Sequence, residues 1–277
     1  MFSKVAVAIA FSPRCEALMS EARRLRDMFQ AELVIIHVGE KLPEDEAHMN
    51  QLLEKTGIGT ERVKVVWEQG DPAEKILAVC KQEHIDLLLA GALKKENLIK
   101  HYVGSIARKI LRKAKCSVLM LTNPAVESAT IKSIVIQGED SPYVVKAIEA
   151  GCKFAQLQKS KQVHIIREIK MYGLTMSVAS EQTEEEYSDT KKKLVADEIK
   201  KVEDILATLD TEGLKINIKI IAGKSGFELA NFAEKFHADL IVAGAPQRSF
   251  SFFSRVFPHH LEYIFAEMPC DVLIVNS

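Results

Sequence analysis

Short runs of apolar residues alternate with longer segments in which apolar residues recur at helical spacing. In the first half of the chain the runs are rich in Val, Ile and Leu and mostly lack polar alternation, which is typical of strands buried on both faces. The expected strands are residues 5–9, 33–38, 63–67, 86–90 and 117–121. The expected helices are residues 13–29, 44–55, 72–84 and 103–115. This alternation predicts a parallel sheet with helices on both faces and right-handed crossovers.

The second half repeats this order of elements. Its expected strands are residues 132–137, 162–168, 216–221, 239–243 and 271–275. Its second helix is longer, at residues 182–210, and carries acidic and basic runs at 184–186 and 191–193. We interpret these runs as a solvated helix face with pairing between successive turns.

The two halves also match in sequence. Residues 70–92 align with residues 223–245 without a gap. The matched positions include Gly70 with Gly223, His84 with His237, Asp86 with Asp239, Gly91 with Gly244, Cys116 with Cys270, and Ser12-Pro13 with Ser141-Pro142. A self-match over this much of a chain indicates duplication. The polar segment 122–130 contains a proline and is the predicted linker, so the predicted domains are residues 1–124 and 130–277.

Composition narrows the class of protein. A chain of 277 residues suits two domains of about 140 residues. With 47% apolar and 27% charged residues and a net charge of −1, it resembles an ordinary globular protein and gives no reason to expect a nucleic-acid partner. No apolar run reaches the length of a membrane span, and residues 5–9 are predicted to be a strand, not part of a signal peptide. Five scattered cysteines favour free thiols in a reducing cytoplasm.

The fold class predicts where a ligand binds. In an open parallel sheet, ligands lie outside the carboxyl ends of the strands, where the strand order reverses. In the first half this directs attention to residues 10–13 and to Gly91, which lets a ligand approach the backbone closely. Gly104-Ser105 opens the last helix of that half, and a helix N-terminus suits a phosphate. The alternative is a glycine turn followed by an ordinary serine cap.

The order of these features resembles the domains of the universal stress protein family. The features are an apolar strand before Ser12-Pro13, His37-Val38, the run Gly70 to Glu74, the run Asp86 to Gly91, Gly104 to Leu111, and Cys116 to Leu121. Each half of the chain shows this resemblance, and the two halves together make up nearly the whole chain. It implies two tandem doubly wound α/β domains with an adenine nucleotide alpha hydrolase-like fold, each a five-stranded parallel sheet flanked by helices. Tandem members look like the family's homodimer fused into one chain, so we expect the halves to pair.

The resemblance also implies a nucleotide site. Many family members bind ATP with a G-x2-G-x9-G-[ST] motif, and Gly91 and Gly104-Ser105 stand at its first and last positions. Lys94 replaces the second glycine, where its ammonium either meets a phosphate or fills the phosphate's place. Ala10 replaces the acidic residue that follows strand one. The expected ligand is ATP or another adenine nucleotide, with the adenine near Ala10, Ser12 and Val38.

The second half departs further from the motif. Gly244 is retained, but Gln247 and 257–259 replace its other glycines, and Pro258 removes an N–H donor. Either Glu139 or Asp140 takes the place of the acidic residue after strand one. We expect this site to be lost, with the aromatic run 249–253 packed under a loop.

The main hypothesis is a binding module rather than a catalyst, because no nucleophile, base and acid stand together in the sequence. A slow ATPase is a weaker alternative. The other alternative is a nucleotide-independent interaction protein that meets partners through the basic helix at 105–115 or through residues 250–253. No metal site is expected, because His259 and His260 are adjacent and point apart on a helix. A homodimer and an unidentified protein partner remain open.

Overall fold

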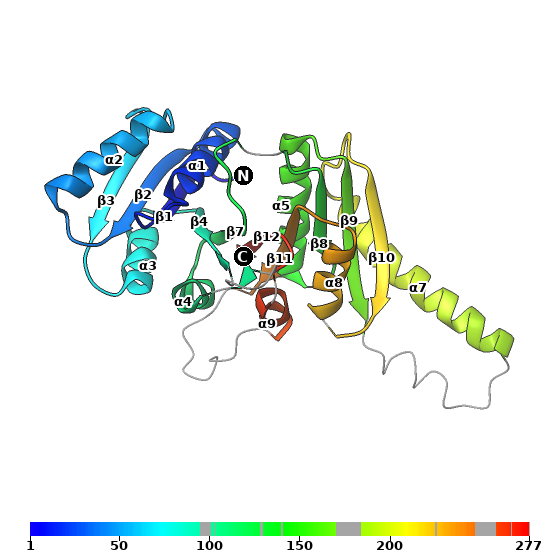
Figure 1. Ribbon diagram of the computed structural model, residues 1–277. Coiled ribbons are helices and arrows are strands. Elements are labelled where there is room, and N and C mark those ends of the chain that lie inside the picture. The colour runs from blue at the N-terminus through cyan, green and yellow to red at the C-terminus, as the bar shows by residue number, and fades with distance from the viewer. Residues whose placement is uncertain are drawn as a thin grey trace. The chain divides into compact units, whose positions relative to one another are not determined.

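The computed structural model describes residues 1–94, 101–102, 104–127, 130–139, 141–169, 184–224, 226–246, 259–266 and 268–276 (Figure 1). The chain divides into two compact units. The first contains Met1–Thr130 together with Asp271–Asn276, and the second contains Ile131–Cys270.

The first unit is built on a sheet in the order β12-β7-β4-β1-β2-β3. Its strands are β1 (Lys4–Ile9), β2 (Glu32–Val38), β3 (Val63–Glu68), β4 (Leu87–Gly91), β7 (Ser117–Leu121) and β12 (Asp271–Asn276). The five strands from the first half are parallel, and β12 pairs antiparallel with β7. Each strand predicted for this half lies where the apolar runs placed it, because both faces of the sheet are covered.

Four helices cover this sheet, α1 and α2 on one face and α3 and α4 on the other (Figure 1). They are α1 (Cys15–Phe29), α2 (Pro43–Lys55), α3 (Pro72–Gln82) and α4 (Ser105–Lys113). As the Asp71-Pro72 pair indicates, α3 begins at Pro72, and the Asp71 carboxylate accepts the N–H of Glu74 at 2.9 Å. A two-residue antiparallel pair, β5 (Leu93–Lys94) with β6 (His101–Tyr102), was not predicted from the sequence.

The second unit has a parallel sheet in the order β10-β9-β8-β11. Its strands are β8 (Ser133–Gln137), β9 (Gln162–Ile169), β10 (Ile216–Ala222) and β11 (Leu240–Ala245). Its helices are α5 (Pro142–Gln158), α7 (Glu184–Leu206), α8 (Phe227–Lys235) and α9 (His259–Ala266). The two units therefore confirm a repeated α/β architecture with parallel strands flanked by helices.

Strand register supports the repeat independently of residue identity. Val5 of β1 stands opposite Leu87 of β4. Ile134 of β8 stands opposite Leu240 of β11 in the same way. These are the residues that the repeat alignment equates, so the two sheets start from the same backbone pairing.

The matched histidines share an unusual backbone conformation. His84 follows α3 with φ 53° and His237 follows α8 with φ 48°, both in the left-handed region. A residue in this conformation ends a helix by turning the chain back toward the next strand. The predicted structural role of the two histidines at the helix-to-strand turn is confirmed.

The matched aspartates hold the start of the first strand in each unit. Asp86 accepts the backbone N–H groups of residues 3–4 on one carboxylate oxygen, at 2.8 and 2.9 Å. Asp239 accepts those of residues 132–133 at 2.7 and 2.9 Å. Each aspartate thus joins the fourth strand of its repeat to the first.

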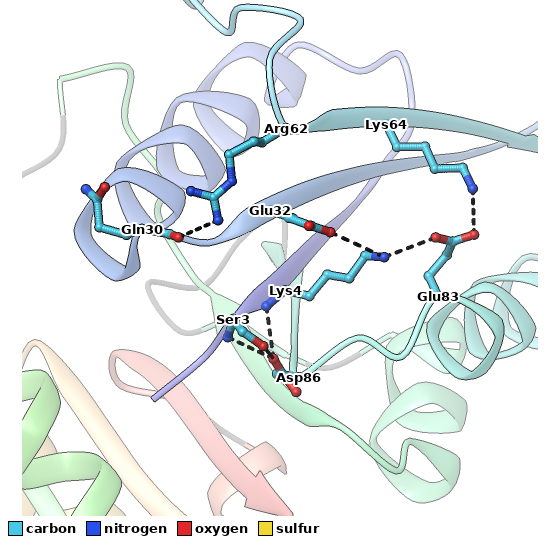
Figure 2. Close-up of polar contacts among 8 residues, drawn as sticks. All are labelled: Ser3, Lys4, Gln30, Glu32, Arg62, Lys64, Glu83 and Asp86. Carbon is cyan, nitrogen blue, oxygen red and sulfur yellow. Dashed lines mark hydrogen bonds and ion pairs between the residues drawn. The ribbon is translucent and has the colours of Figure 1, made fainter.

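Around Asp86 lies a network of ion pairs (Figure 2). Lys4 on β1 reaches Glu83 at 3.3 Å and Glu32 at 3.5 Å, and Lys64 on β3 reaches Glu83 at 2.7 Å. The hydrogen bond from Lys64, together with Lys4, holds the pKa of Glu83 below its ordinary value against the effect of burial. The network links β1, β2 and β3 to the end of α3.

We expect Asp86→Ala to lower the free energy of unfolding by about 1.5 kcal/mol, because two backbone donors lose a charged acceptor. Asp86→Asn is the control, since its amide oxygen can still accept both bonds, and it should cost less than half as much. Urea unfolding of the two variants measures the difference. Equal losses would mean that the carboxylate acts through its charge and not through these hydrogen bonds.

Candidate functional site

The strand order of the first unit reverses at β1, which lies between β2 and β4. β2 and β3 lie on one side of β1, and β4 and β7 lie on the other side. This is the arrangement in which a crevice forms at the carboxyl ends of the strands. The residues that follow β1 and β4 therefore lie at the carboxyl edge of the sheet where its strand order reverses, and their role in a site stays a prediction.

Strand register brings three of the predicted site residues to this edge. Ile9 stands opposite His37, so the next residues, Ala10 and Val38, end neighbouring strands. Gly91 ends β4 on the other side of β1. Ala10 and Ser12 are exposed and Val38 is half-buried.

Aromatic rings that the sequence analysis did not single out gather beside these residues. Phe11 stacks on His37 at a centroid distance of 4.5 Å and on His48 of α2 at 4.8 Å. Trp67 of β3 meets the edge of His37 at 4.9 Å. His37 is buried, and its Nδ1 has no hydrogen-bond partner among the described residues. The signal in the sequence was an aromatic or imidazole ring at the end of each of three neighbouring strands.

Arg14 is a second residue that the sequence analysis missed. Its guanidinium donates to the carbonyl of Ala92, just after β4, and to that of Thr122, just after β7, both at 2.6 Å. Arg14 therefore lies across the carboxyl ends of two parallel strands and brings a positive charge to this edge. A charge in this position favours an anionic ligand.

The N-terminus of α4 is the next feature of this edge. Gly104 is its N-cap in an extended conformation, and among the described residues no side chain caps the helix. The first intrahelical bond runs from Arg108 N–H to Gly104 oxygen, at 2.9 Å, so the N–H groups before Arg108 lack helical acceptors. Gly104 is buried and Ser105 exposed. Since α4 follows β4 in a crossover to β7, this end of the helix belongs to the carboxyl edge of the sheet.

Lys94 lies in β5, opposite His101 of β6. The short pair fixes its backbone between β4 and α4. Residues 95–100 and 103, which include Lys95 and Lys100 of the predicted basic patch, lie outside the described residues. The structure thus leaves both interpretations of Lys94 as predictions.

At the corresponding edge of the second unit, several polar groups are paired with one another. Gln137, at the end of β8, accepts the N–H of Gly244 at 3.0 Å. A Cβ added to Gly244 would stand 2.6 Å from the backbone oxygen of Tyr143, whereas one on Gly91 would meet only the Leu18 side chain, at 3.4 Å. Gly244 is therefore more tightly packed than Gly91, and the atoms that crowd it belong to the backbone.

Two charged residues at the end of β9 also pair with groups of the second unit. By strand register Arg167 corresponds to His37 and Glu168 to Val38. Arg167 forms a buried ion pair with Glu198 of α7 and donates to the oxygen of Gly138 at 3.0 Å. Glu168 accepts the N–H groups of residues 226 and 229 at 2.7 and 2.9 Å, and so fills the N-terminus of α8.

Several positions named for the second half lie outside the described residues. They are Asp140, Gln247, residues 249–253 and residues 257–258. Glu139 is described and half-buried. The predicted packing of the aromatic run therefore stays a prediction.

In the described part of the chain, no three His, Cys, Asp or Glu residues lie close enough together to hold a metal ion. Among the helices of that part, none combines the length and the apolar composition that crossing a bilayer requires.

Comparison with known proteins places this geometry in context. The model of the universal stress protein family matches residues 1–122 and again residues 130–276. A universal stress protein of Methanothermobacter thermautotrophicus is 33% identical over 55 residues, which are 20% of this chain and 37% of that protein. The universal stress protein YxiE of Bacillus subtilis is 26% identical over 147 residues, which cover 44% of this chain and 99% of that protein.

The fold has counterparts among solved structures. A universal stress protein from Archaeoglobus fulgidus superposes with a TM-score of 0.66 at 14% identity, covering 99% of this chain and 98% of that one. At this level of identity the likeness concerns the fold.

Proposed function

The chain belongs to the universal stress protein family, and from this premise we propose that its first unit binds an adenine nucleotide at the carboxyl ends of β1 and β4. The observation that carries the proposal is the open N-terminus of α4 at Gly104. It lies at the edge of the sheet where Arg14 supplies a positive charge. Within one sheet edge these groups offer N–H donors without helical acceptors, a helix dipole and a guanidinium, all of which favour a phosphate.

In this proposal the phosphates meet Gly104 and Ser105, and Gly91 lets them approach the backbone. Lys94 contributes as a point charge. The base lies near Ala10, Ser12 and Val38, next to the rings of Phe11 and its neighbours. Since Ala10 offers no carboxylate, shape and stacking hold the base in place of an acidic hydrogen-bond acceptor.

The proposal assigns one site to the chain. Gln137 and Glu168 occupy donors in the second unit that a ligand would need, so we propose that this unit has lost its site. We further propose that the protein works in the cytoplasm as a stress-response binding module, with its two halves paired as in the family's homodimer. The five cysteines, all free thiols, support this compartment.

Calorimetric titration of ATP, ADP and AMP into protein stripped of ligands tests the proposal. We expect about one nucleotide per chain, and Gly104→Asp should weaken binding at least about tenfold. Aspartate is a favoured N-cap, so it keeps the helix start while placing a carboxylate where the phosphate would bind. Gly59→Asp is the matched control, because a side chain at Gly59 would meet nothing within 4 Å. Unchanged affinity in Gly104→Asp would overturn the site assignment.

A specific observation favours a second candidate, a nucleotide-independent interaction protein. The Phe11 ring already stacks on both His37 and His48, and Ala10 lacks the family's carboxylate. Partner surfaces such as the basic face of α4 would then carry the function. No heat with any nucleotide at millimolar concentration would select this candidate.

A further inference from the structure

A chain of hydrogen bonds leads from the candidate site to β12. Arg14, at the start of α1, donates to the carbonyls of Ala92 and Thr122, both at 2.6 Å. Thr122 is buried and donates its backbone N–H and its hydroxyl to one carboxylate oxygen of Asp271, both at 2.8 Å. Asp271 is the first residue of β12. Three side chains thus connect the carboxyl edge of the first sheet to a strand from the far end of the chain.

Arg14 joins two strand ends at once. The N–H of Ala92 donates to the carbonyl of Leu121 at 2.8 Å, so the two carbonyls that Arg14 contacts belong to the paired ends of β4 and β7. Both acceptors are uncharged, and they leave the positive charge of the guanidinium uncompensated. A guanidinium carries five N–H donors in a rigid fork. It can therefore bind an oxyanion with its other N–H groups while it keeps both carbonyls.

The repeat shows that this connection belongs to one end of the β7–β12 pair. These are equivalent strands of the two repeats, so Thr122 corresponds to Asn276 and Asp271 to Ser117. At that other end the N–H of Asn276 reaches the Ser117 hydroxyl only at 3.4 Å, and the acceptor is neutral. The repeat position of the arginine holds Tyr143, which has no guanidinium. Only the edge of the first unit is therefore connected to this strand pair by charged groups.

We propose that an anion bound at the carboxyl edge of the first unit strengthens the attachment of β12 through Arg14, Thr122 and Asp271. The inference rests on the proposed function, because the anion is the phosphate group of the nucleotide. A bound anion holds the guanidinium where it donates to both carbonyls. Successive hydrogen bonds in a buried setting polarise one another, so the bonds from Thr122 to Asp271 strengthen as well. Coupling of this kind is reciprocal, so β12 in turn favours the bound anion.

Hydrogen–deuterium exchange of the whole protein, read by peptide mass spectrometry with and without saturating ATP, tests the inference. We expect ATP to slow exchange of residues 271–276 at least about fivefold more than exchange of β3. A ligand that binds only the folded state stabilises the whole unit to some degree. Since β3 lies at the far edge of the same sheet, it reports that general effect.

Thr122→Val separates the connection from the ligand site. The variant keeps the carbonyl that accepts from Arg14 and nearly the same side-chain volume, but it loses the hydroxyl that donates to Asp271. It should at least halve the extra protection that ATP gives to residues 271–276. By reciprocity it should weaken ATP binding by the same factor. A merely structural role would instead speed exchange equally with and without ATP. Thr60→Val, at an exposed threonine of the same unit, is the matched control and should behave as wild type.

The outcomes separate this inference from the proposed function. If calorimetry shows that ATP binds but residues 271–276 are protected no more than β3, the inference is wrong and the nucleotide site stands. If ATP gives no heat, the proposed function is wrong. Millimolar pyrophosphate, which supplies phosphates without a base, then decides the inference, and unchanged exchange of residues 271–276 overturns it. Equal protection in Thr122→Val and wild type would also overturn it, because the effect would reach β12 by another route.

Discussion

Replacing Arg167 with Met is expected to lower the free energy of unfolding by about 3 kcal/mol, the low end of the cost of removing one partner from a buried ion pair. The change leaves the Glu198 carboxylate, which is about 13% exposed, without the guanidinium that it contacts. It also removes the donor to Gly138. Lys201 remains at 2.8 Å from Glu198, but its side chain is half exposed and compensates only in part.

The effect should depend on pH with a definite sign. Burial acts to raise the pKa of Glu198, but the hydrogen bonds from Lys201 and Arg167 outweigh it and hold the pKa below the ordinary 4.5. A carboxyl group whose pKa is lowered by folding stabilises the fold at pH values above its unfolded-state pKa. This stabilisation is lost as the pH falls through its folded-state pKa. The difference between wild type and Arg167→Met should therefore shrink below pH 4.5.

Two variants serve as controls for this result. Replacing both partners, as Arg167→Met with Glu198→Leu, should recover most of the loss, because no charge stays buried. Lys192→Met removes an exposed ion pair with Asp189 from the same helix and should change stability by less than about 0.5 kcal/mol. A loss in Lys192→Met as large as in Arg167→Met would mean that the helix responds to any change of charge.

The matched glycines give the second large effect. Gly244→Ala should destabilise the protein by roughly 2–3 kcal/mol, because the new methyl group would meet the backbone oxygen of Tyr143 at 2.6 Å and force the start of α5 away. Gly91→Ala at the repeat-equivalent position should change stability by less than about 1 kcal/mol, since it meets only the flexible Leu18 side chain at 3.4 Å. Urea unfolding of the two variants measures this contrast.

The pair of variants also tests the difference between the carboxyl edges of the two sheets. If both alanines were tolerated equally, the backbone around Gly244 would be free to yield, and the second unit would have room at its sheet edge. If both were equally harmful, the crevice of the first unit would be closed as well, and nucleotide binding there would lose its support.

Most of the fold was predictable because it rests on repeated local signals. Runs such as Val5–Ile9 are apolar throughout, and both faces of the resulting strands are buried, so their pattern reports burial directly. The duplication adds a second sample of each signal, which is why His84 and His237 could be assigned to the same turn. The pair β5–β6 was missed because two residues, Leu93 and Lys94, carry no periodicity.

The site was less predictable because its key contacts join residues far apart in sequence. Arg14 looked like a helix-start residue, and its role depends on carbonyls 78 and 108 positions away. The stack of Phe11, His37 and His48 arises only when β1, β2 and α2 come together. Sequence spacing pointed to Gly91 and Gly104 because the motif is a fixed spacing of residues in the sequence. The contacts of the aromatic rings and of the guanidinium join residues that are distant in sequence, so spacing does not reveal them.

The pairing of β12 with β7 has a consequence for how the chain matures. Thr122, just after β7, donates to Asp271 at the start of β12 through its N–H and its hydroxyl, both at 2.8 Å, across 149 positions of sequence. At ribosomal rates of about 5–20 residues per second, roughly 10–30 s pass between the synthesis of β7 and that of β12. Its open edge (Ser117–Leu121) is in that interval a template for pairing with other chains. Fragments cut at the linker would keep that vulnerability permanently, so dissection of this protein into separately expressed halves calls for residues 271–276 to be grafted back onto the first.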